Sequence, residues 1–210
     1  MTGIDEQFPE HRKEDPVSMA YAFELLASQV WTTDDLDTLP EDSPRRELID
    51  GVPNVSPAPS RFHQSIAARL NSALLQSCPD DFDVSQGVEV RISKTRSFIP
   101  DVVVTRAKAT FVHYAAPDEV VLAIEIVSPS STLLDRVTKP AAYAQAGVPF
   151  YWRIETHDPG HVRVDTYALS ESGAVYAPTG EFTDVIELDQ PWRIRLPVAD
   201  IVSPVYRTES

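Results

Sequence analysis

The sequence predicts an α/β (α+β) domain with a mixed central β-sheet flanked by helices, and three observations support this fold class. Residues 120–127 are apolar except for one charge, which is typical of a strand buried on both faces. Phe62, Ile66, Leu70 and Leu74 recur at the spacing of an amphipathic helix. The predicted elements follow the order helix, hairpin, helix, strands, helix, strands.

The first predicted elements are a short helix and a hairpin. We expect a helix over residues 33–39, because Thr33 resembles an N-cap followed by acidic first-turn residues. A hairpin should follow over residues 46–55. Its turn is Asp50-Gly51, a pair that adopts the positive backbone angles of a type I′ turn.

The remaining elements are read from periodicity and turn residues. Ser60 should cap the long helix, which runs to about Ser77 and is stopped by Pro79. The later predictions are strands at 82–92 and 98–106 separated by residues 93–97, a strand at 120–127, a helix at 137–146 ended by Gly147, a strand at 150–154, a meander at 161–196 with turns at 172–173 and 179–180, and a last helical turn at 198–201.

The charge is unevenly distributed along the chain. The net charge is −14, which argues against a nucleic-acid partner. Residues 1–42 hold 11 acidic and 2 basic side chains, whereas residues 43–210 hold 21 and 16, so most of the excess lies in the leader. We therefore divide the chain into an acidic, mobile N-terminal extension at 1–30, a folded domain at 31–204 and a C-terminal tail at 205–210.

Cysteine content and hydropathy exclude several classes of protein. Cys78 is the only cysteine, so an internal disulfide framework and a cysteine-based zinc site are both excluded. No apolar run approaches the ~20 residues of a membrane span, and the N-terminus lacks the pattern of a secretory signal. We expect a cytoplasmic protein with no membrane partner.

Two carboxylates stand where structure alone would not place them. Asp101 follows Pro100 at the head of an apolar strand, and Glu125 is embedded in the most apolar strand. Burying an unpaired carboxylate costs several kcal/mol, and either a salt bridge or a bound cation offsets this cost. A salt bridge is the commoner remedy for one such residue, but two on neighbouring strands favour a cation. Their hard oxygen ligands suit Mg²⁺ or Mn²⁺.

Several segments resemble, in the same order, the Uma-type endonuclease family of the PD-(D/E)XK nuclease superfamily. The resemblance covers about residues 31–200. It rests on Glu47-Leu48-Ile49-Asp50-Gly51, Ser56-Pro57, His63, Pro100-Asp101, Glu125-Ile126-Val127-Ser128-Pro129-Ser130-Ser131, Asp135, Lys139, Tyr143, Gly147-Val148-Pro149 and Tyr151-Trp152.

The resemblance implies a restriction-endonuclease-like fold for residues 31–204 and assigns roles to the acids. Asp101 and Glu125 match the two metal-binding acids, and the backbone carbonyl of Ile126 would complete the protein ligands. The cofactor would be Mg²⁺ or Mn²⁺. Glu47 matches an acid that lies near a second metal or orients water.

The catalytic lysine has an unusual position. The superfamily places it two residues after the glutamate, where this chain has Val127, and the resemblance assigns the role to Lys139. Asp135, Lys139 and Tyr143 are spaced by four, so they share one helical face that lines the site. The alternative is a solvent-facing Asp–Lys pair worth only ~0.3–0.5 kcal/mol. Pro140 disfavours helical geometry at Lys139 and leaves its direction open.

Other residues near these motifs have two interpretations each. His63 is either a structural histidine or a residue that lines the site, and we do not assign it as a ligand. Tyr151 and Trp152 look like core residues beneath the site. A set of basic residues is either a solvated strand edge or a phosphate-contacting patch: Arg91, Lys94, Arg96, Arg106, Lys108, Arg136 and Lys139.

The sequence therefore predicts a metal-dependent endonuclease that hydrolyses phosphodiester bonds in DNA. The competing interpretation is a catalytically silent binding or regulatory module on a nuclease-like scaffold. Val127, Pro140 and the acidic net charge favour that second interpretation. A homodimer would supply two sites for two strand cuts.

Overall fold

The computed structural model describes residues 30–40, 43–56, 58–107, 113–127, 133–158 and 161–206. Predictions for residues 1–29, for most of the C-terminal tail and for Lys108 lie outside the described residues. The helices are α2 (Thr33–Asp37), α3 (Arg61–Ser77), the π-helix η1 (Leu134–Thr138), α4 (Lys139–Gln145), α5 (Val198–Ile201) and the 3-10 helix η2 (Pro204–Tyr206). The strands are β1 (Glu47–Ile49), β2 (Val52–Asn54), β3 (Phe82–Ser85), β4 (Glu89–Ser93), β5 (Arg96–Phe98), β6 (Val102–Arg106), β7 (Tyr114–Ala115), β8 (Val120–Ile126), β9 (Phe150–Asp158), β10 (His161–Leu169), β11 (Tyr176–Phe182), β12 (Val185–Leu188) and β13 (Ile194–Pro197).

A six-stranded mixed sheet forms the centre of the domain at residues 31–206, in the order β11-β10-β9-β8-β6-β3. β8 and β9 are parallel, and the other neighbouring pairs are antiparallel. The predicted mixed central sheet is confirmed, and β6 and β8 are neighbours as the sequence predicted. Asp101 therefore comes directly before a strand that pairs with the strand carrying Glu125.

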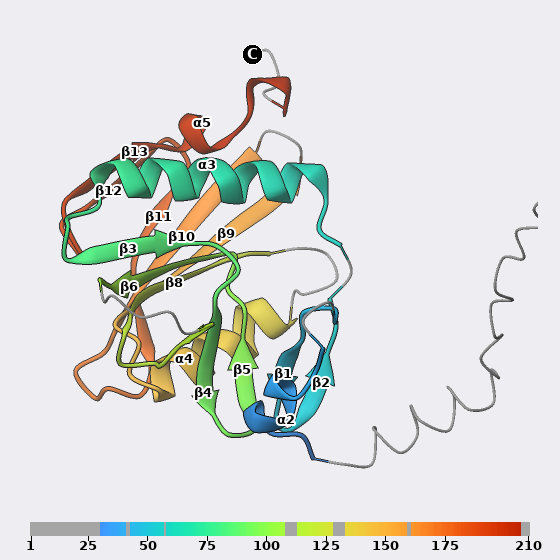
Figure 1. Cartoon of the computed structure of the whole chain (residues 1–210). Helices are drawn as coiled ribbons and strands as arrows, with labels where there is room; N and C mark the ends of the chain where they lie inside the picture. Colours follow the sequence, from blue (N-terminus) through green and yellow to red (C-terminus); the bar gives the residue numbers. More distant parts are fainter. Residues whose placement is uncertain are drawn as a thin grey trace, which may run out of the picture. The chain divides into compact units, whose positions relative to one another are not determined.

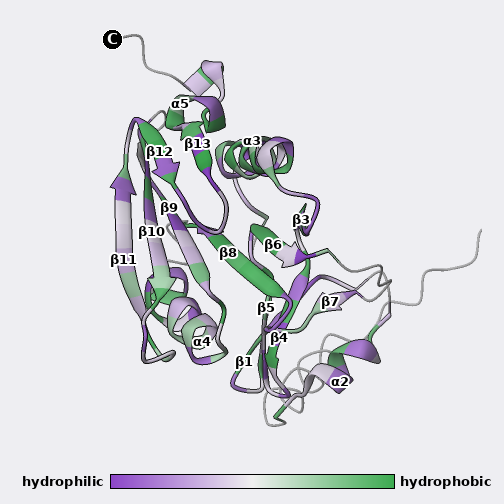
Figure 2. Ribbon diagram, turned by 90° about the vertical axis from the view of Figure 1, so that its left-hand side faces the viewer, coloured by the Kyte–Doolittle hydropathy of each residue, from purple (hydrophilic) through white to green (hydrophobic). Residues whose placement is uncertain are grey.

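Alternate residues of the central strands pack into two separate hydrophobic clusters. Leu122, Ile124 and Ile126 of β8 belong to the cluster that contains α3 and α5, whereas Ala123 belongs to the cluster that contains α4. Figure 2 shows the apolar β8 running between α3 and α4. All seven β8 residues are buried, which explains why the polar–apolar alternation of a surface strand is missing from its sequence.

A second sheet, in the order β2-β1-β5-β4-β7, carries the predicted hairpin (Figure 1). Its turn has φ of 50° at Asp50 and 81° at Gly51, which confirms the positive backbone angles expected there. The short helix before it begins at Thr33 as predicted and ends at Asp37 rather than at residue 39, but its N-cap is Thr32, not Thr33. The Thr32 side chain accepts from the Asp35 backbone N–H, and the Asp35 carboxylate accepts from Thr32 in return.

The two strands predicted at 82–92 and 98–106 are four strands in the structure, so this prediction is wrong in its boundaries. Gly87 has φ of 65°, and it interrupts the first run between β3 and β4. Residues expected to form a loop at 93–97 instead belong partly to the tight β4–β5 hairpin. The 82–106 segment therefore crosses between both sheets, with β3 and β6 in the central one.

Of the other predicted elements, some are confirmed and one turn is wrong. Ser60 caps α3 by accepting from the His63 backbone N–H at 3.2 Å, and α3 ends at Ser77 as predicted. Of the two turns predicted in the meander, Gly173 lies in a turn with φ of 69°. Gly180 does not: it lies within β11, opposite Thr166, next to a register shift between β10 and β11.

Within the described part of the chain, no helix combines the length and the apolar character that crossing a lipid bilayer requires.

Neighbouring leucines on α3 provide a test of this packing. Leu74 is fully buried in the cluster with β6 and β8, whereas Leu75 is 53% exposed. We expect Leu74→Ala to lower the free energy of unfolding by about 2–5 kcal/mol, because it leaves a cavity. Leu75→Ala should change it by less than about 0.5 kcal/mol. Urea denaturation measures both, and equal losses would contradict the placement of α3.

Candidate active site

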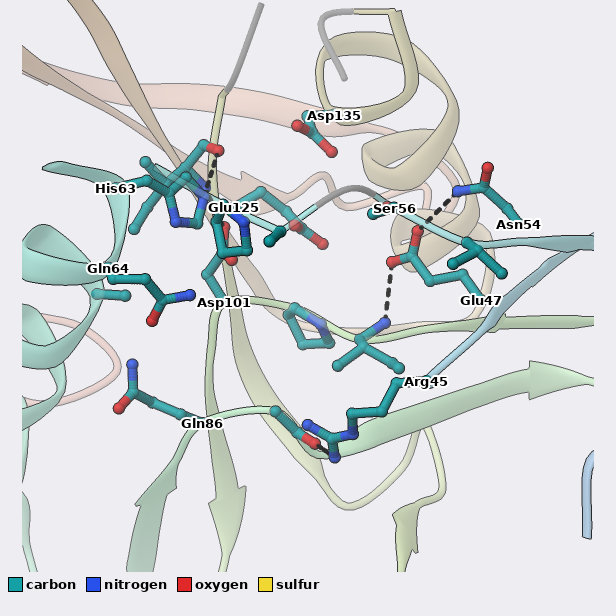
Figure 3. A pocket seen from close by; sticks show the side chains of 18 of the residues that line it. Arg45, Glu47, Asn54, Ser56, His63, Gln64, Gln86, Asp101, Glu125 and Asp135 are labelled. Carbon is teal, nitrogen blue, oxygen red and sulfur yellow. Dashed lines mark hydrogen bonds and ion pairs between the residues drawn. The ribbon is translucent and has the colours of Figure 1, made fainter. Parts of the chain in front are cut away.

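A pocket of about 690 Å³ collects nearly all the residues that the sequence singled out. Its walls come from the β1–β2 hairpin, the start of α3, the segment before β6, the end of β8 and the η1–α4 helix (Figure 3). Tyr143 is the one predicted site residue that does not line the pocket, and it lies behind Glu125. The residues that do line it are Glu47, His63, Asp101, Glu125, Ile126, Asp135 and Lys139.

Glu125 faces α4, on the opposite side of β8 from Ile124 and Ile126. Its Oε2 accepts from Lys139 Nζ at 3.0 Å, and its Oε1 accepts from the Tyr143 hydroxyl at 3.1 Å. Burial raises the pKa of Glu125 well above its usual value, and the Lys139 ammonium opposes that shift only in part. The carboxylate is therefore fully bonded by side chains of one helix face.

Lys139 is buried among three carboxylates. Its Nζ lies 2.8 Å from Glu47 Oε1, 3.0 Å from Glu125 Oε2 and 3.4 Å from Asp135 Oδ1. Burial acts to lower the pKa of Lys139, but the surrounding carboxylates outweigh it and raise the pKa above the usual lysine value. The side chain is an ammonium ion at neutral pH, and it points to the acids as the resemblance implied.

The helix that carries Lys139 differs from the one the sequence predicted. It begins at Leu134 rather than 137, and its first turn is a π-helix in which the Lys139 N–H bonds the Leu134 carbonyl. Pro140 has no N–H to offer the next carbonyl, that of Asp135. The Tyr151 hydroxyl donates to this carbonyl instead, at 2.6 Å. The helix can therefore run through Pro140, and Asp135, Lys139 and Tyr143 all reach the site.

Asp101 and the Ile126 backbone form the other side of the site. The Ile126 N–H donates to Asp101 Oδ2 at 2.7 Å, so this carboxylate extends the hydrogen-bond ladder between β6 and β8. His63 Nε2 lies 3.2 Å from Asp101 Oδ2 and 3.2 Å from the Ile126 carbonyl oxygen. Burial acts to lower the pKa of His63, but the bonds to Asp101 and Ile126 raise it overall.

Glu47 connects the hairpin to the site. Its Oε1 accepts from the Ile99 N–H at 3.1 Å and also contacts Lys139. Asn54 donates to its Oε2 at 3.5 Å. These contacts hold the Glu47 carboxylate against the Lys139 ammonium, so the hairpin fixes the position of the lysine from the side opposite α4.

The charges of the site do not balance. Four carboxylates, those of Glu47, Asp101, Glu125 and Asp135, surround one ammonium ion and one imidazole. With all four ionised and His63 protonated, negative charge exceeds positive charge among these six groups, and the raised pKa of Glu125 follows from its burial and from this crowding. A divalent cation matches that excess, and carboxylate and carbonyl oxygens suit Mg²⁺ or Mn²⁺.

The donor set fits such an ion on the Asp101 side of the pocket. Within the described ranges, no group of three or more His, Cys, Asp or Glu side chains is arranged to hold a metal. The Asp101 carboxylate and the Ile126 carbonyl nevertheless meet at the pocket, and Asp101 remains 24% exposed. A backbone carbonyl is an ordinary ligand for hard cations, so these donors are suited to one ion.

Three of the predicted basic residues pair with carboxylates in the described part of the chain. Arg91 pairs with Asp37 and Glu89, and Arg96 pairs with Asp50. Arg136 pairs with Glu155 at 2.6 Å. These contacts support a salt-bridged surface for the three arginines rather than a phosphate-contacting patch.

Three polar residues at the edge of the pocket are among those that the sequence reasoning missed. Arg45, Gln64 and Gln86 lie at the edge of the pocket (Figure 3), and Arg45 donates to the Gly87 carbonyl. They come from the segment before β1, from α3 and from the loop after β3. No periodicity or motif could single them out, because only the tertiary fold brings these segments together.

The architecture, a mixed sheet with helices on both faces and an acidic pocket at the end of β8, is that of a nuclease-like α+β domain. A crystal structure from Anabaena variabilis, described as a "putative nuclease", matches it with a TM-score of 0.62 and 17% sequence identity. The match covers 81% of this chain and 96% of the other. At this identity the likeness shows the fold alone.

The family follows from the sequence itself. Residues 33–199 match the Uma2 family, which is described as "Putative restriction endonuclease". The chain belongs to this family, as its motifs predicted. No curated protein matches the chain in sequence.

The bond between Tyr151 and the Asp135 carbonyl gives a testable coupling. Tyr151→Phe removes the donor from a buried carbonyl and should lower the free energy of unfolding by about 1–3 kcal/mol. With Pro140→Ala, residue 140 supplies an N–H for the same carbonyl, so Tyr151→Phe should then cost less. A double-mutant cycle with urea denaturation measures the difference.

Tyr176→Phe is the matched control for this cycle. The Tyr176 hydroxyl donates to the Val148 carbonyl at 2.9 Å, away from residue 140. Its cost should be the same in both backgrounds. If Tyr151→Phe lowers the free energy of unfolding by the same amount in the wild-type and in the Pro140→Ala background, the Tyr151 hydroxyl does not replace the N–H that Pro140 lacks.

Proposed function

We propose that the protein is a metal-dependent endonuclease that hydrolyses phosphodiester bonds in DNA. The observation that carries the proposal is that four carboxylates gather in one pocket around a single ammonium ion and a single imidazole. Such an arrangement lowers stability unless a cation neutralises it, so it is characteristic of a functional site. Membership of the family described as "Putative restriction endonuclease" supports nucleic acid as the substrate.

Asp101 and the Ile126 carbonyl would hold the ion, which would be Mg²⁺ or Mn²⁺. The second oxygen of Asp101 and the Glu125 carboxylate would complete the protein ligands if Glu125 exchanged one of its bonds to Lys139 or Tyr143. When bound, the ion supplies a Lewis acid for the scissile phosphate and lowers the pKa of a bound water.

Lys139 supplies the positive charge of the chain itself. Its ammonium is kept protonated by Glu47, Glu125 and Asp135, and it is held in place without solvent. A fixed ammonium beside the phosphate would stabilise the charge that develops on the phosphoryl oxygens, or would orient the attacking water. Glu47 would act as a positioning residue, since its contacts are with Lys139, the Ile99 N–H and Asn54 of the hairpin.

DNA would approach over the edge of the pocket. Arg45 is exposed there and provides a guanidinium for a backbone phosphate, and Gln64 and Gln86 provide amide groups. A chain with 32 acidic and 18 basic residues repels DNA at long range. Binding should therefore be weak and should depend on the bound cation.

A second function, a catalytically silent binding module, is favoured by one observation. Both Glu125 oxygens are already bonded, one to Lys139 and one to Tyr143, so the glutamate has no oxygen without a donor. Calorimetric titration with Mn²⁺ separates the two functions. Absence of binding at millimolar metal would favour the silent module.

DNA cleavage provides the direct test of the endonuclease. The purified protein should nick or cut plasmid DNA with Mg²⁺ or Mn²⁺ and should stop when a chelator is added. Loss of an outer-shell partner alone costs roughly 10–100-fold in activity, so Asp101→Asn, which alters a ligand, should cost at least about 100-fold.

Asp83→Asn is the control, because Asp83 is an exposed carboxylate on β3 outside the pocket. It should cut DNA at the wild-type rate. Equal cleavage by the wild type and the Asp101→Asn variant would show that the activity comes from a contaminant or from another site.

A further inference from the structure

His63 occupies an unusual place for a structural histidine. It lies in the first turn of α3, where the Ser60 hydroxyl fixes its backbone N–H. Its Nε2 lies 3.2 Å from Asp101 Oδ2 and 3.2 Å from the Ile126 carbonyl oxygen. These are the two groups to which the proposed function assigns the ion.

The two separations are those of neighbouring ligands on one ion. Ligands at about 2.1 Å from a divalent metal, at angles of about 90–110°, lie roughly 3.0–3.4 Å from each other. The Nε2 atom therefore stands at a third corner beside the two oxygens, on the side where the pocket is lined by His63 and Gln64 of α3 (Figure 3).

Hydrogen bonding alone explains this arrangement poorly. Nε2 carries at most one proton, which would be shared between two acceptors, each at 3.2 Å, the long end of the usual 2.7–3.2 Å range. Asp101 Oδ2 already accepts a bond from the Ile126 N–H at 2.7 Å. The other ring nitrogen, Nδ1, is buried with no hydrogen-bond partner in the described part of the chain. All polar contacts of the ring therefore run to the two candidate ligand groups.

The Lys139 side of the site is already occupied by a positive charge. The Lys139 ammonium lies between 2.8 and 3.4 Å from Glu47, Glu125 and Asp135, and so fills the space that these three acids share. A second cation there would meet the ammonium charge directly. The place for one ion is consequently on the Asp101 side, next to His63.

We propose that His63 Nε2 is a protein ligand of this ion, and that the site therefore prefers a divalent transition metal such as Mn²⁺ to Mg²⁺. The inference rests on the proposed metal site and goes beyond it by adding a nitrogen donor and a metal preference. Imidazole is a softer ligand than carboxylate or carbonyl oxygen, and it binds first-row transition ions in preference to Mg²⁺.

Calorimetric titrations of the full-length protein with Mn²⁺ and with Mg²⁺ test the preference. His63→Gln replaces the ring nitrogen with an amide, whose oxygen is a hard donor at a similar reach. We expect this variant to bind Mn²⁺ at least about tenfold more weakly, a loss no smaller than that caused by altering an outer-shell partner. Its affinity for Mg²⁺ should change much less, so the ratio of the two affinities should fall.

His161→Gln is the matched control. His161 is exposed on β10 and does not line the pocket, so its replacement should leave both affinities unchanged. Thermal melts without metal check that both variants fold. Pulsed electron paramagnetic resonance of bound Mn²⁺ gives an independent readout, since a ligating ring nitrogen produces a coupling that changes when histidine is labelled with ¹⁵N.

The outcomes separate this inference from the proposed function. Nitrogen coupling in the wild type and in His161→Gln, lost in His63→Gln, would support the ligand assignment. A second outcome is that Asp101→Asn abolishes metal binding, but the bound Mn²⁺ shows no nitrogen coupling and His63→Gln keeps the wild-type metal preference. This outcome would overturn the assignment of His63 and leave the metal site in place. No binding of either ion at millimolar concentration would overturn both.

Discussion

The site is organised around the buried ammonium of Lys139. This one cation holds carboxylates from three parts of the chain: Glu47 from the hairpin, Glu125 from the central sheet and Asp135 from the π-helix. Without it the three acids would repel each other in a place with little water. With it they still exceed the positive charge, and this imbalance connects the architecture to a cation.

The constraint on Lys139 explains several local irregularities. A regular helix interrupted by Pro140 would not carry Asp135, Lys139 and Tyr143 on one face. In the structure the first turn is a π-helix. The Tyr151 hydroxyl donates to the Asp135 carbonyl, which Pro140 cannot bond because it has no N–H. Tyr151 is a core residue beneath the site, as the sequence suggested, but its hydroxyl also determines the path of the helix. Single π-helical turns within α-helices occur frequently at functional sites.

The sequence predicted those features that depend on local pattern or on burial. An apolar run interrupted by one charge identified β8, and helical spacing identified α3. Acids at the head of one apolar strand and within another identified Asp101 and Glu125. Lys139 came mainly from the family resemblance, because spacing alone left a solvent-facing Asp–Lys pair as an alternative. The predicted catalytic residues do line one pocket, although their catalytic roles stay predictions: Glu47, Asp101, Glu125 and Lys139.

Features that depend on long-range contacts could not be predicted in this way. The two runs at 82–106 divide between two sheets, with Gly87 at a positive φ between β3 and β4, and a one-dimensional pattern does not show which sheet a strand joins. Arg45 lines the pocket and donates to the Gly87 carbonyl, 42 residues further along the chain. The orientation of the His63 ring depends on Asp101 and Ile126, more than 35 residues away, so the sequence left its role open between structure and site.

The central claim is that the excess negative charge of this pocket exists to bind one divalent ion on the Asp101 side. The most direct measurement is a crystal structure of the full chain soaked in Mn²⁺, with anomalous diffraction data. The account predicts a single anomalous peak within about 2.3 Å of an Asp101 oxygen and the Ile126 carbonyl, with Lys139 still bonded to Glu47. A pocket with no peak at millimolar Mn²⁺ would contradict it, as would a peak among Glu47, Glu125 and Asp135 in place of the ammonium.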